Sequence, residues 1–496
     1  LHKIYNAFPI YRNELHKFFS IVFLMFNILN AQNLLRALKD NVISYYLGFE
    51  ATNVLKSFAI IPVTMLITML YIKLVTIFTP LTVFYIFYIS FIVVFVVFAF
   101  VVLPNHHILN VSDSTLSYWV DLYPAFKWFI LCAGKWVFSL FYILCEMWPV
   151  IMYSLLFWQF VNSFILPSES KRFYIAFGVI GQLAQFFVSF FLQNRYLLQD
   201  YIHSSEITIF KYIFVSDYDD LVTQITVMTV CISGVLGVYA LYYINNYIID
   251  SKTLNKEQLV ENRRHLGLID SIRFVLQHRY ILMLFGILIT YGICVNLSEI
   301  YWKSVCRQYY TTKMDFAVFQ GNVMFYNAIC TIIGNLLGSF ILTRVRWIYI
   351  AMITPVILLI SGSIFFIVAE YVYIYPEILF VKYGIQGVYM VIILGAVSNV
   401  LTKSAKYSTF DSSKEMLYTV LSHEVKTKGK AVAITGNKGG KGISSFFLTL
   451  VVLPFYGDYV SAGKLMFIVF FITVLVWIFL VNRLDDEYNR RVANKT

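Results

Sequence analysis

The fold class is most evident in residues 81–103, which read LTVFYIFYISFIVVFVVFAFVVL. This stretch contains no charged residue, and it is longer than the ~20 residues that a helix needs to cross the hydrocarbon core of a bilayer. It is also longer than the ~10-residue strands of alternating polarity that build a membrane barrel. The stretch therefore predicts a transmembrane helix.

The composition of the whole chain agrees with this prediction. Of its 496 residues, 59% are hydrophobic and 13% are charged, whereas soluble proteins carry about 25% charged residues. The mean hydropathy is +0.73. These values exclude soluble, fibrous, disordered and disulfide-rich secreted proteins. The six cysteines have no CxxC spacing, and all but Cys306 lie well inside apolar runs, so we expect buried thiols rather than disulfides or a metal site.

Twelve apolar segments predict an all-α integral membrane protein with two six-helix halves. The segments are 18–38, 54–78, 81–103, 127–166, 173–196, 221–248, 280–302, 316–343, 347–372, 383–402, 431–456 and 464–482. The halves are 18–248 and 280–482, with an N-terminus at 1–17, a polar central loop at 249–279 and a tail at 483–496. Segment 127–166 is long enough to be one long span or a span with an interfacial lead-in. The run that starts near Phe18 is expected to be retained rather than cleaved, since no small-residue cleavage site follows it.

The distribution of Lys and Arg predicts the orientation. Stretches 249–279 and 403–430 contain six of these residues each, and loop 104–126 contains none. With twelve spans, both basic stretches fall on the side of the two termini, which the positive-inside rule assigns to the cytoplasm. The net charge of +11 is thereby attributed to loops, and with no long basic arm we expect no nucleic acid as partner.

Segment 127–166 contains two charges, Lys135 and Glu146, at membrane depth. An ionisable residue near the bilayer centre costs ~3 kcal/mol on insertion scales, so each is a functional candidate. At ~100° per residue, an offset of eleven residues returns to nearly the same helix face. We therefore expect both side chains to line one cavity.

Two other segments end in charges. Segment 280–302 closes with Glu299, which Lys303 follows at i+4, and segment 18–38 ends with Arg36, Lys39 and Asp40. Glu299, Lys303, Arg36 and Lys39 are candidates for the same cavity. The alternative is that the Glu299/Lys303 and Arg36/Asp40 spacings are interfacial pairs, each contributing a few tenths of a kcal/mol.

A glycine-rich stretch, GNKGGKG, spans residues 436–442 and contains Lys438 and Lys441. It fails the Walker A pattern, because Thr435 and Gly442 stand where Gly and Ser or Thr are required. It could still offer backbone N–H groups and positive charge to an anion. The alternative is a flexible helix start with Lys441 extended to the lipid headgroups. No motif indicates a cofactor, and adjacent His106 and His107 are not expected to hold a metal.

Eleven short sequence motifs, spread over most of the chain, carry a resemblance to a known family. They are PIYRNE (9–14), LRALKD (35–40), FKWF (126–129), GKW (134–136), EMW (146–148), SLLFWQF (154–160), KRFY (171–174), VNLSE (295–299), WKS (302–304), FDSSKEMLY (410–418) and KGKA (428–431). Together they resemble the nucleotide transporter family, the ATP/ADP translocases of Rickettsia and Chlamydia with relatives in plastids and microsporidia. The resemblance implies a major-facilitator-like fold that exchanges nucleotides by alternating access. It also implies four essential embedded charges, which fall on Lys39, Glu146, Glu299 and Lys441.

Two departures from the family pattern suggest a divergent paralogue. The family usually continues Leu-Trp-Gly after the Glu of the fourth span, where this chain has Met147-Trp148-Pro149, and Pro149 is expected to kink the helix. The late Gly-Lys-Ser-Gly-Gly string is here Gly440-Lys441-Gly442-Ile443-Ser444. The base preference of the substrate is therefore open.

The resulting hypothesis is an antiporter, not an enzyme, that exchanges host nucleoside triphosphate for bacterial nucleoside diphosphate. Lys39 and Lys441 would clamp the phosphates, and Glu146 and Glu299 would pair with them in the empty carrier. Trp148 and Trp302 could stack on the base, or they are aromatic belt residues. We expect a bacterial inner-membrane location, with nucleotides and the bilayer as partners and no obligatory protein partner. Alternatives are import of GTP, UTP or CTP, or a proton-coupled multidrug antiporter with Glu146 as proton site.

Overall fold

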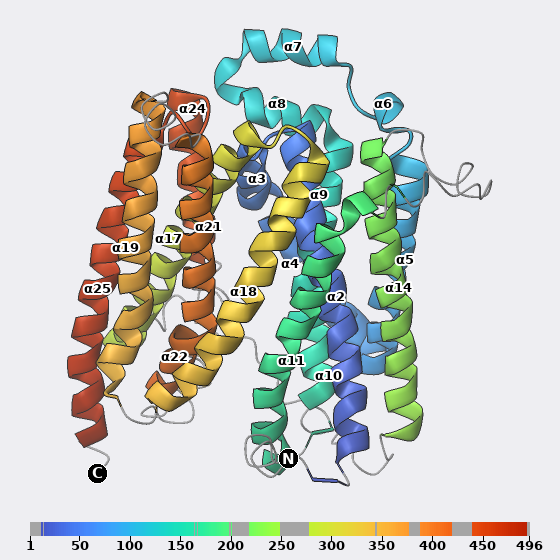
Figure 1. Ribbon diagram of the computed structural model, residues 1–496. Helices are drawn as coiled ribbons and strands as arrows, with labels where there is room; N and C mark the ends of the chain where they lie inside the picture. The colour runs from blue at the N-terminus through green and yellow to red at the C-terminus, as the bar shows by residue number, and fades with distance from the viewer. Residues whose placement is uncertain are drawn as a thin grey trace.

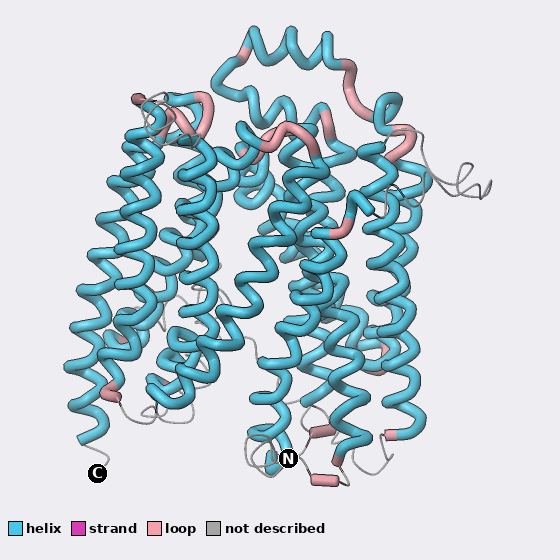
Figure 2. The backbone as a smooth tube through the Cα atoms, in the orientation of Figure 1, coloured by secondary structure: helices cyan, strands magenta, loops and turns pink. Residues whose placement is uncertain are grey.

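The computed structural model of this protein is built from helices. It describes residues 11–12, 14–162, 164–165, 167–197, 200, 218–248, 277–342, 345–375, 387–418 and 439–493. Within these ranges the chain forms helices joined by short loops, and no strand is present (Figure 2). Helices suit a chain this apolar, because they satisfy every backbone hydrogen bond locally, where no water is available.

Eleven helices in the described ranges are long and apolar enough to cross a membrane. They match eleven of the twelve predicted segments. The remaining segment, 173–196, coincides largely with α11 (Pro167–Gln193), a helix of 27 residues that packs on α2 and α18. The all-α membrane fold predicted from the sequence is confirmed.

The first bundle comprises the helices before the central stretch. Its elements are α2 (Leu15–Tyr46), α3 (Glu50–Leu55), η1 (Lys56–Ile60), α4 (Ile61–Ile77), α5 (Pro80–Val97), η2 (Phe98–Val102), α6 (His106–Leu109), α7 (Asp113–Leu122), η3 (Pro124–Phe126), α8 (Lys127–Gly134), α9 (Trp136–Trp148), η4 (Pro149–Phe157), α10 (Trp158–Asn162), α11 and α14 (Tyr218–Tyr247). Helix α2 lies at the centre of this bundle, against α9, α11 and α14.

The second bundle follows residue 277. Its elements are α17 (Arg279–Tyr309), α18 (Lys313–Leu342), α19 (Trp347–Ile374), α21 (Gly387–Ala405), η5 (Lys406–Phe410), α22 (Asp411–Leu417), the helical residues 439–447, η6 (Leu448–Val452), α24 (Leu453–Tyr456) and α25 (Gly463–Ala493). Helix α17 packs on α21 and α25, and α19 packs on both of those helices.

The two bundles stand side by side, and α11 and α18 pack against each other between them (Figure 1). Helix α2 starts, and α25 ends, at the same end of the molecule, which we call the terminal end. The short helix α7 lies across the opposite end (Figure 1). The predicted N-terminus 1–17 and central loop 249–279 lie mostly outside the described residues.

Four helices continue well beyond the ends predicted for them. One is α25, which runs to Ala493 instead of 482, and the other three lead into paired charges. Helix α2 runs to Tyr46 instead of 38, α17 runs to Tyr309 instead of 302, and the helix from Gly387 runs through η5 and α22 to Leu417 instead of 402. In each case the prediction stopped where charged residues begin. These charges pair with one another inside the protein, so they did not end the helix.

The predicted segment 127–166 divides into a lead-in helix, α8, and a span, Trp136–Val161. Lys135 lies at the break between them, with a non-helical backbone (φ −97°, ψ 47°). Pro149 does not break the helix. It is the first residue of the π-helical turns of η4.

Gly440 marks a close approach between the helical residues 439–447 and α17. A Cβ atom on Gly440 would overlap the backbone carbonyl of Ile289, whereas one on Gly439 would meet nothing within 4 Å. We therefore expect Gly440→Ala to destabilise the purified protein by about 1–3 kcal/mol through overpacking. Gly439→Ala is the matched control. Thermal unfolding in detergent measures both, and equal midpoints for the two variants would contradict this packing.

Candidate functional site

Six charged side chains form an unbroken chain of ion pairs in the middle of the molecule. In the first bundle, Lys39 Nζ on α2 lies 2.8 Å from Glu146 Oε1 on α9 and 3.0 Å from Asp40 Oδ1. Lys39 also lies 4.5 Å from the ring centre of Tyr142, a further favourable contact for a cation. We call the six residues of this chain (Glu146, Lys39, Asp40, Lys303, Glu299 and Lys403) the ion-pair chain.

The ion-pair chain crosses from one bundle to the other at Asp40. The second carboxylate oxygen of Asp40 accepts a hydrogen bond of 2.7 Å from Lys303 Nζ on α17. Lys303 lies 3.1 Å from Glu299, one helical turn earlier, and Glu299 lies 3.5 Å from Lys403 on α21. Three lysines and three carboxylates thus balance, and each bundle supplies three of the six.

Burial within the ion-pair chain increases towards Asp40. The side chains of Asp40 and Lys39 are 6% and 9% exposed, whereas those of Glu146 and Glu299 are 27% and 22% exposed. A buried charge is tolerated when it is paired and hydrogen-bonded. The pairing therefore explains how charges can lie at the centre of so apolar a protein.

Three cations lie beside the ion-pair chain. Lys441, in the helical residues 439–447, is within electrostatic range of Glu299, Lys403 and Arg36. Arg36 is exposed, although it lies one turn from buried Lys39 on α2. Lys56, the first residue of η1, is partly buried and donates a hydrogen bond of 3.4 Å to Asn296 Oδ1 on α17. Lys438 lies outside the described residues.

Lys135 occupies a different place from the other predicted site residues. Its ammonium lies 3.2 Å from Asp113 at the start of α7, and that carboxylate is 87% exposed. The structure thus puts Lys135 at the end of the molecule opposite the termini. Because the helix breaks at Lys135, the spacing of 100° per residue no longer relates the direction of this side chain to that of Glu146.

The two tryptophans considered for base stacking are packed inside their bundles. Trp148 is fully buried among Tyr88, Phe91 and Phe95, and its indole N–H donates to the carbonyl of Ile28 at 3.1 Å. Trp302 is 5% exposed and donates to the carbonyl of Ile392 at 2.9 Å. Neither ring offers a free face to a base.

Asp40, Lys403 and Lys56 were missed as site residues. Asp40 was considered only as a partner of Arg36, but its carboxylate instead joins Lys39 to Lys303. Lys403 was counted as a loop charge because the predicted helix ended at 402, and Lys56 was not singled out. A signal was available, since all three lie in or next to apolar runs and carry a charge.

Polar contacts join the bundles at the end opposite the termini. The side chain of Asn41 on α2 donates to the carbonyl of Lys313 on α18 at 2.9 Å. Arg307 on α17 donates to the carbonyl of Ser44 at 3.0 Å. Both contacts lie beyond the ion-pair chain, on the parts of α2 and α17 that the prediction had left out of the membrane.

Helices α11 and α18 also contact each other towards the end opposite the termini. Gly321, near the start of α18, faces the backbone of Ser189, near the end of α11. Further along, Gly338 of α18 faces Ser408 of its own bundle, and Phe177 of α11 stacks near Phe18 of α2. The two helices thus contact each other near the end opposite the termini, and each packs on its own bundle nearer the terminal end.

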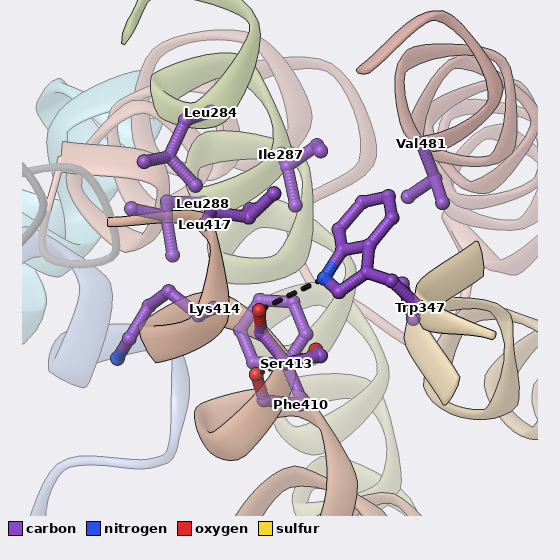
Figure 3. Close-up of a pocket in the computed structure, with 10 residues that line it drawn as sticks. Leu284, Ile287, Leu288, Trp347, Phe410, Ser413, Lys414, Leu417 and Val481 are labelled. Carbon is purple, nitrogen blue, oxygen red and sulfur yellow. Dashed lines mark hydrogen bonds between the residues drawn. The ribbon is translucent and has the colours of Figure 1, made fainter. Parts of the chain in front are cut away.

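A pocket in the second bundle is unsuited to a polar ligand (Figure 3). Apolar side chains of α17, α22 and α25 line it, and the indole of Trp347 donates to the carbonyl of Ser413 at 3.0 Å. Lys414 extends away from the indole (Figure 3) and pairs with Asp411 at 3.1 Å. In the described part of the chain, no group of three His, Cys, Asp or Glu side chains could hold a metal ion.

The sequence matches known transporters over nearly its whole length. The family model for the TLC ATP/ADP transporter matches residues 3–488. The ADP,ATP carrier protein 4 of Rickettsia bellii is 37% identical, over 99% of this chain and 95% of that protein. The ADP,ATP carrier protein 5 of Rickettsia prowazekii is 31% identical, over 97% of this chain and 96% of that protein.

Solved structures share the fold at low sequence identity. A bacterial homologue of the iron transporter ferroportin in an inward-facing state has a TM-score of 0.56, with 11% identity, and covers 96% of this chain and 100% of that chain. The xylose transporter XylE from E. coli in an inward-open conformation has a TM-score of 0.53, with 10% identity, and covers 92% of this chain and 95% of that chain. These likenesses concern the fold alone. The family match and the identity to the rickettsial carriers show that the chain belongs to the TLC ATP/ADP transporter family.

Proposed function

We propose that this protein exchanges a nucleoside triphosphate, ATP by family default, for a nucleoside diphosphate across the bacterial inner membrane. The observation that carries the proposal is the ion-pair chain, which brings cations from both bundles to the interface between them. A site at the interface of two bundles can open to either side as they rock. The nucleotide is carried unchanged, so no catalytic step is needed.

The cations of the site suit a polyanion. The ion-pair chain is balanced, and Arg36, Lys56 and Lys441 add positive charge beside it. Phosphate oxygens can replace Glu146 and Glu299 as partners of the lysines. In the empty carrier the carboxylates return to the lysines, and this pairing avoids the cost of reorienting unpaired charges through the membrane.

The residues proposed to act on the substrate are Lys39, Glu146, Glu299, Lys303 and Lys441, together with Arg36. Lys135 is left out, because it pairs with an exposed carboxylate at the far end. Trp148 and Trp302 are left out because both are packed. Lysine suits this task, since its flexible ammonium can release the phosphate in every cycle.

The proposed orientation puts both termini in the cytoplasm, in agreement with the distribution of Lys and Arg. The bundles then contact each other on the outer side of the ion-pair chain. This arrangement corresponds to a carrier closed towards the outside.

A proton-coupled drug antiporter is the competing class. A site for cationic drugs is acidic and apolar, because a fixed lysine repels the substrate. Here the lysines outnumber the carboxylates around the interface once Lys56 and Lys441 are included. The site therefore favours an anion, and GTP, UTP or CTP remain the competitors within the class.

The decisive test is uptake of labelled nucleotides by bacteria that express the chain. We expect saturable uptake of ATP that accelerates when the cells, or proteoliposomes, are preloaded with ADP. Competition by unlabelled GTP, UTP and CTP gives the base preference. Absence of any nucleotide uptake, together with proton-driven export of a cationic drug, would overturn the proposal in favour of the competing class.

The pair between Lys39 and Glu146 gives a second prediction. Lys39→Gln removes a proposed phosphate ligand, and Glu146→Gln removes the carboxylate that pairs with this lysine in the empty carrier. Loss of one charge-assisted contact costs about 1.5–3 kcal/mol, so we expect exchange to fall at least about tenfold. Asp113→Asn is the matched control, because it removes a carboxylate from an exposed lysine pair. Rates are compared at equal amounts of protein in the membrane. Wild-type exchange in either glutamine variant would remove that residue from the site.

A further inference from the structure

The partners of Lys56 differ from those of the lysines in the ion-pair chain. Its ammonium donates to Asn296 Oδ1 at 3.4 Å, and in the described part of the chain no carboxylate lies within 4 Å of it. The charged groups within electrostatic range are Lys39 and Lys303, which repel it, and Glu146 and Glu299, which attract it. Those four already pair with one another along the ion-pair chain. Lys56 is therefore a partly buried cation without a counterion.

The polar group that holds Lys56 is itself fixed by hydrogen bonds, because three acceptors share the two N–H groups of the Asn296 amide. Asn296 Nδ2 donates to Ser444 Oγ at 2.8 Å, to Ser445 Oγ at 3.2 Å and to Asn53 Oδ1 at 3.5 Å. The amide of Asn296 is thus oriented so that its oxygen faces Lys56. Asn53 comes from the first bundle and the serines from the second, so both bundles build this part of the interface.

Lys56 and Lys441 lie on neighbouring helices. Phe58 and Phe446, which follow these lysines, have ring centres 5.9 Å apart, and Ser445 donates to Asn53 at 2.9 Å. The helix of Lys56 belongs to the first bundle and the helix of Lys441 to the second. One cation from each bundle therefore lies beside the interface, Lys56 from the first and Lys441 from the second.

We propose that Lys56 is a phosphate-binding residue that acts opposite Lys441 and receives the phosphate groups of the incoming nucleotide. This inference rests on the proposed nucleotide exchange. Lys39 is already held by Glu146 and Asp40, whereas Lys56 can contact phosphate without first giving up a carboxylate. Asn296 keeps the ammonium in place while the site is empty. Lys56 accordingly makes the first contact with the substrate, and the ion-pair chain opens afterwards.

The test compares Lys56→Gln and Lys56→Arg with wild type and with Lys73→Gln, which removes an exposed lysine from the same membrane span. Loss of one charge-assisted bond to phosphate costs about 1.5–3 kcal/mol, so for Lys56→Gln we expect the KM for ATP to rise at least about tenfold. The concentration of ATP that gives half of the maximal thermal stabilisation of the purified protein rises by the same factor. Lys56→Arg retains most of the affinity, and Lys73→Gln matches wild type.

A purely structural role for Lys56 predicts a different result. Removal of an uncompensated buried charge leaves the unfolding midpoint without ATP unchanged or higher, whereas loss of a structural contact lowers it. A lower midpoint with unchanged ATP dependence in Lys56→Gln overturns the inference and leaves the proposed exchange intact. A wild-type protein that neither exchanges ATP nor is stabilised by it refutes the proposed function itself.

Discussion

Charges inside a membrane persist only where other charges compensate them, and this constraint shapes the centre of the protein. Asp40 contacts Lys39 of its own bundle and Lys303 of the other, so one carboxylate links the two bundles. The helices can then continue past their charged residues, and their extended parts carry the contacts that join the bundles beyond the ion-pair chain. Helix length, bundle contact and site position thus depend on the same pairing.

The sequence predicts the fold well, because membrane helices are recognised by length and apolarity alone. It also identifies Lys39, Glu146, Glu299 and Lys303 as embedded charges, which the structure joins in one chain. It could not show that Asp40 bridges two lysines, since contacts across an interface are not encoded in the spacing along one helix. The same apolar criterion ended α21 before Lys403, which concealed a member of the ion-pair chain.

Helical periodicity predicted the directions of side chains less well than apolarity predicted the helices. The 100° rule failed between Lys135 and Glu146, because the chain leaves helical geometry at Lys135. Elsewhere π-helical turns shift the faces of helices, as at η1, which Lys56 starts, and at η5, which Lys406 starts. The tryptophans show a further limit of the sequence, because an indole near a site glutamate can equally well pack inside a bundle, as Trp148 and Trp302 do.

The burial of Asp40 has a consequence for how the resting protein responds to its medium. Ions of the solvent screen exposed charges over about 10 Å at moderate ionic strength, but they act little on pairs removed from water. The link from Lys39 through Asp40 to Lys303 is of the second kind, and the pair of Lys135 with Asp113 is of the first. The connection between the bundles is therefore less sensitive to the salt content of its surroundings than the pair of Lys135 with Asp113.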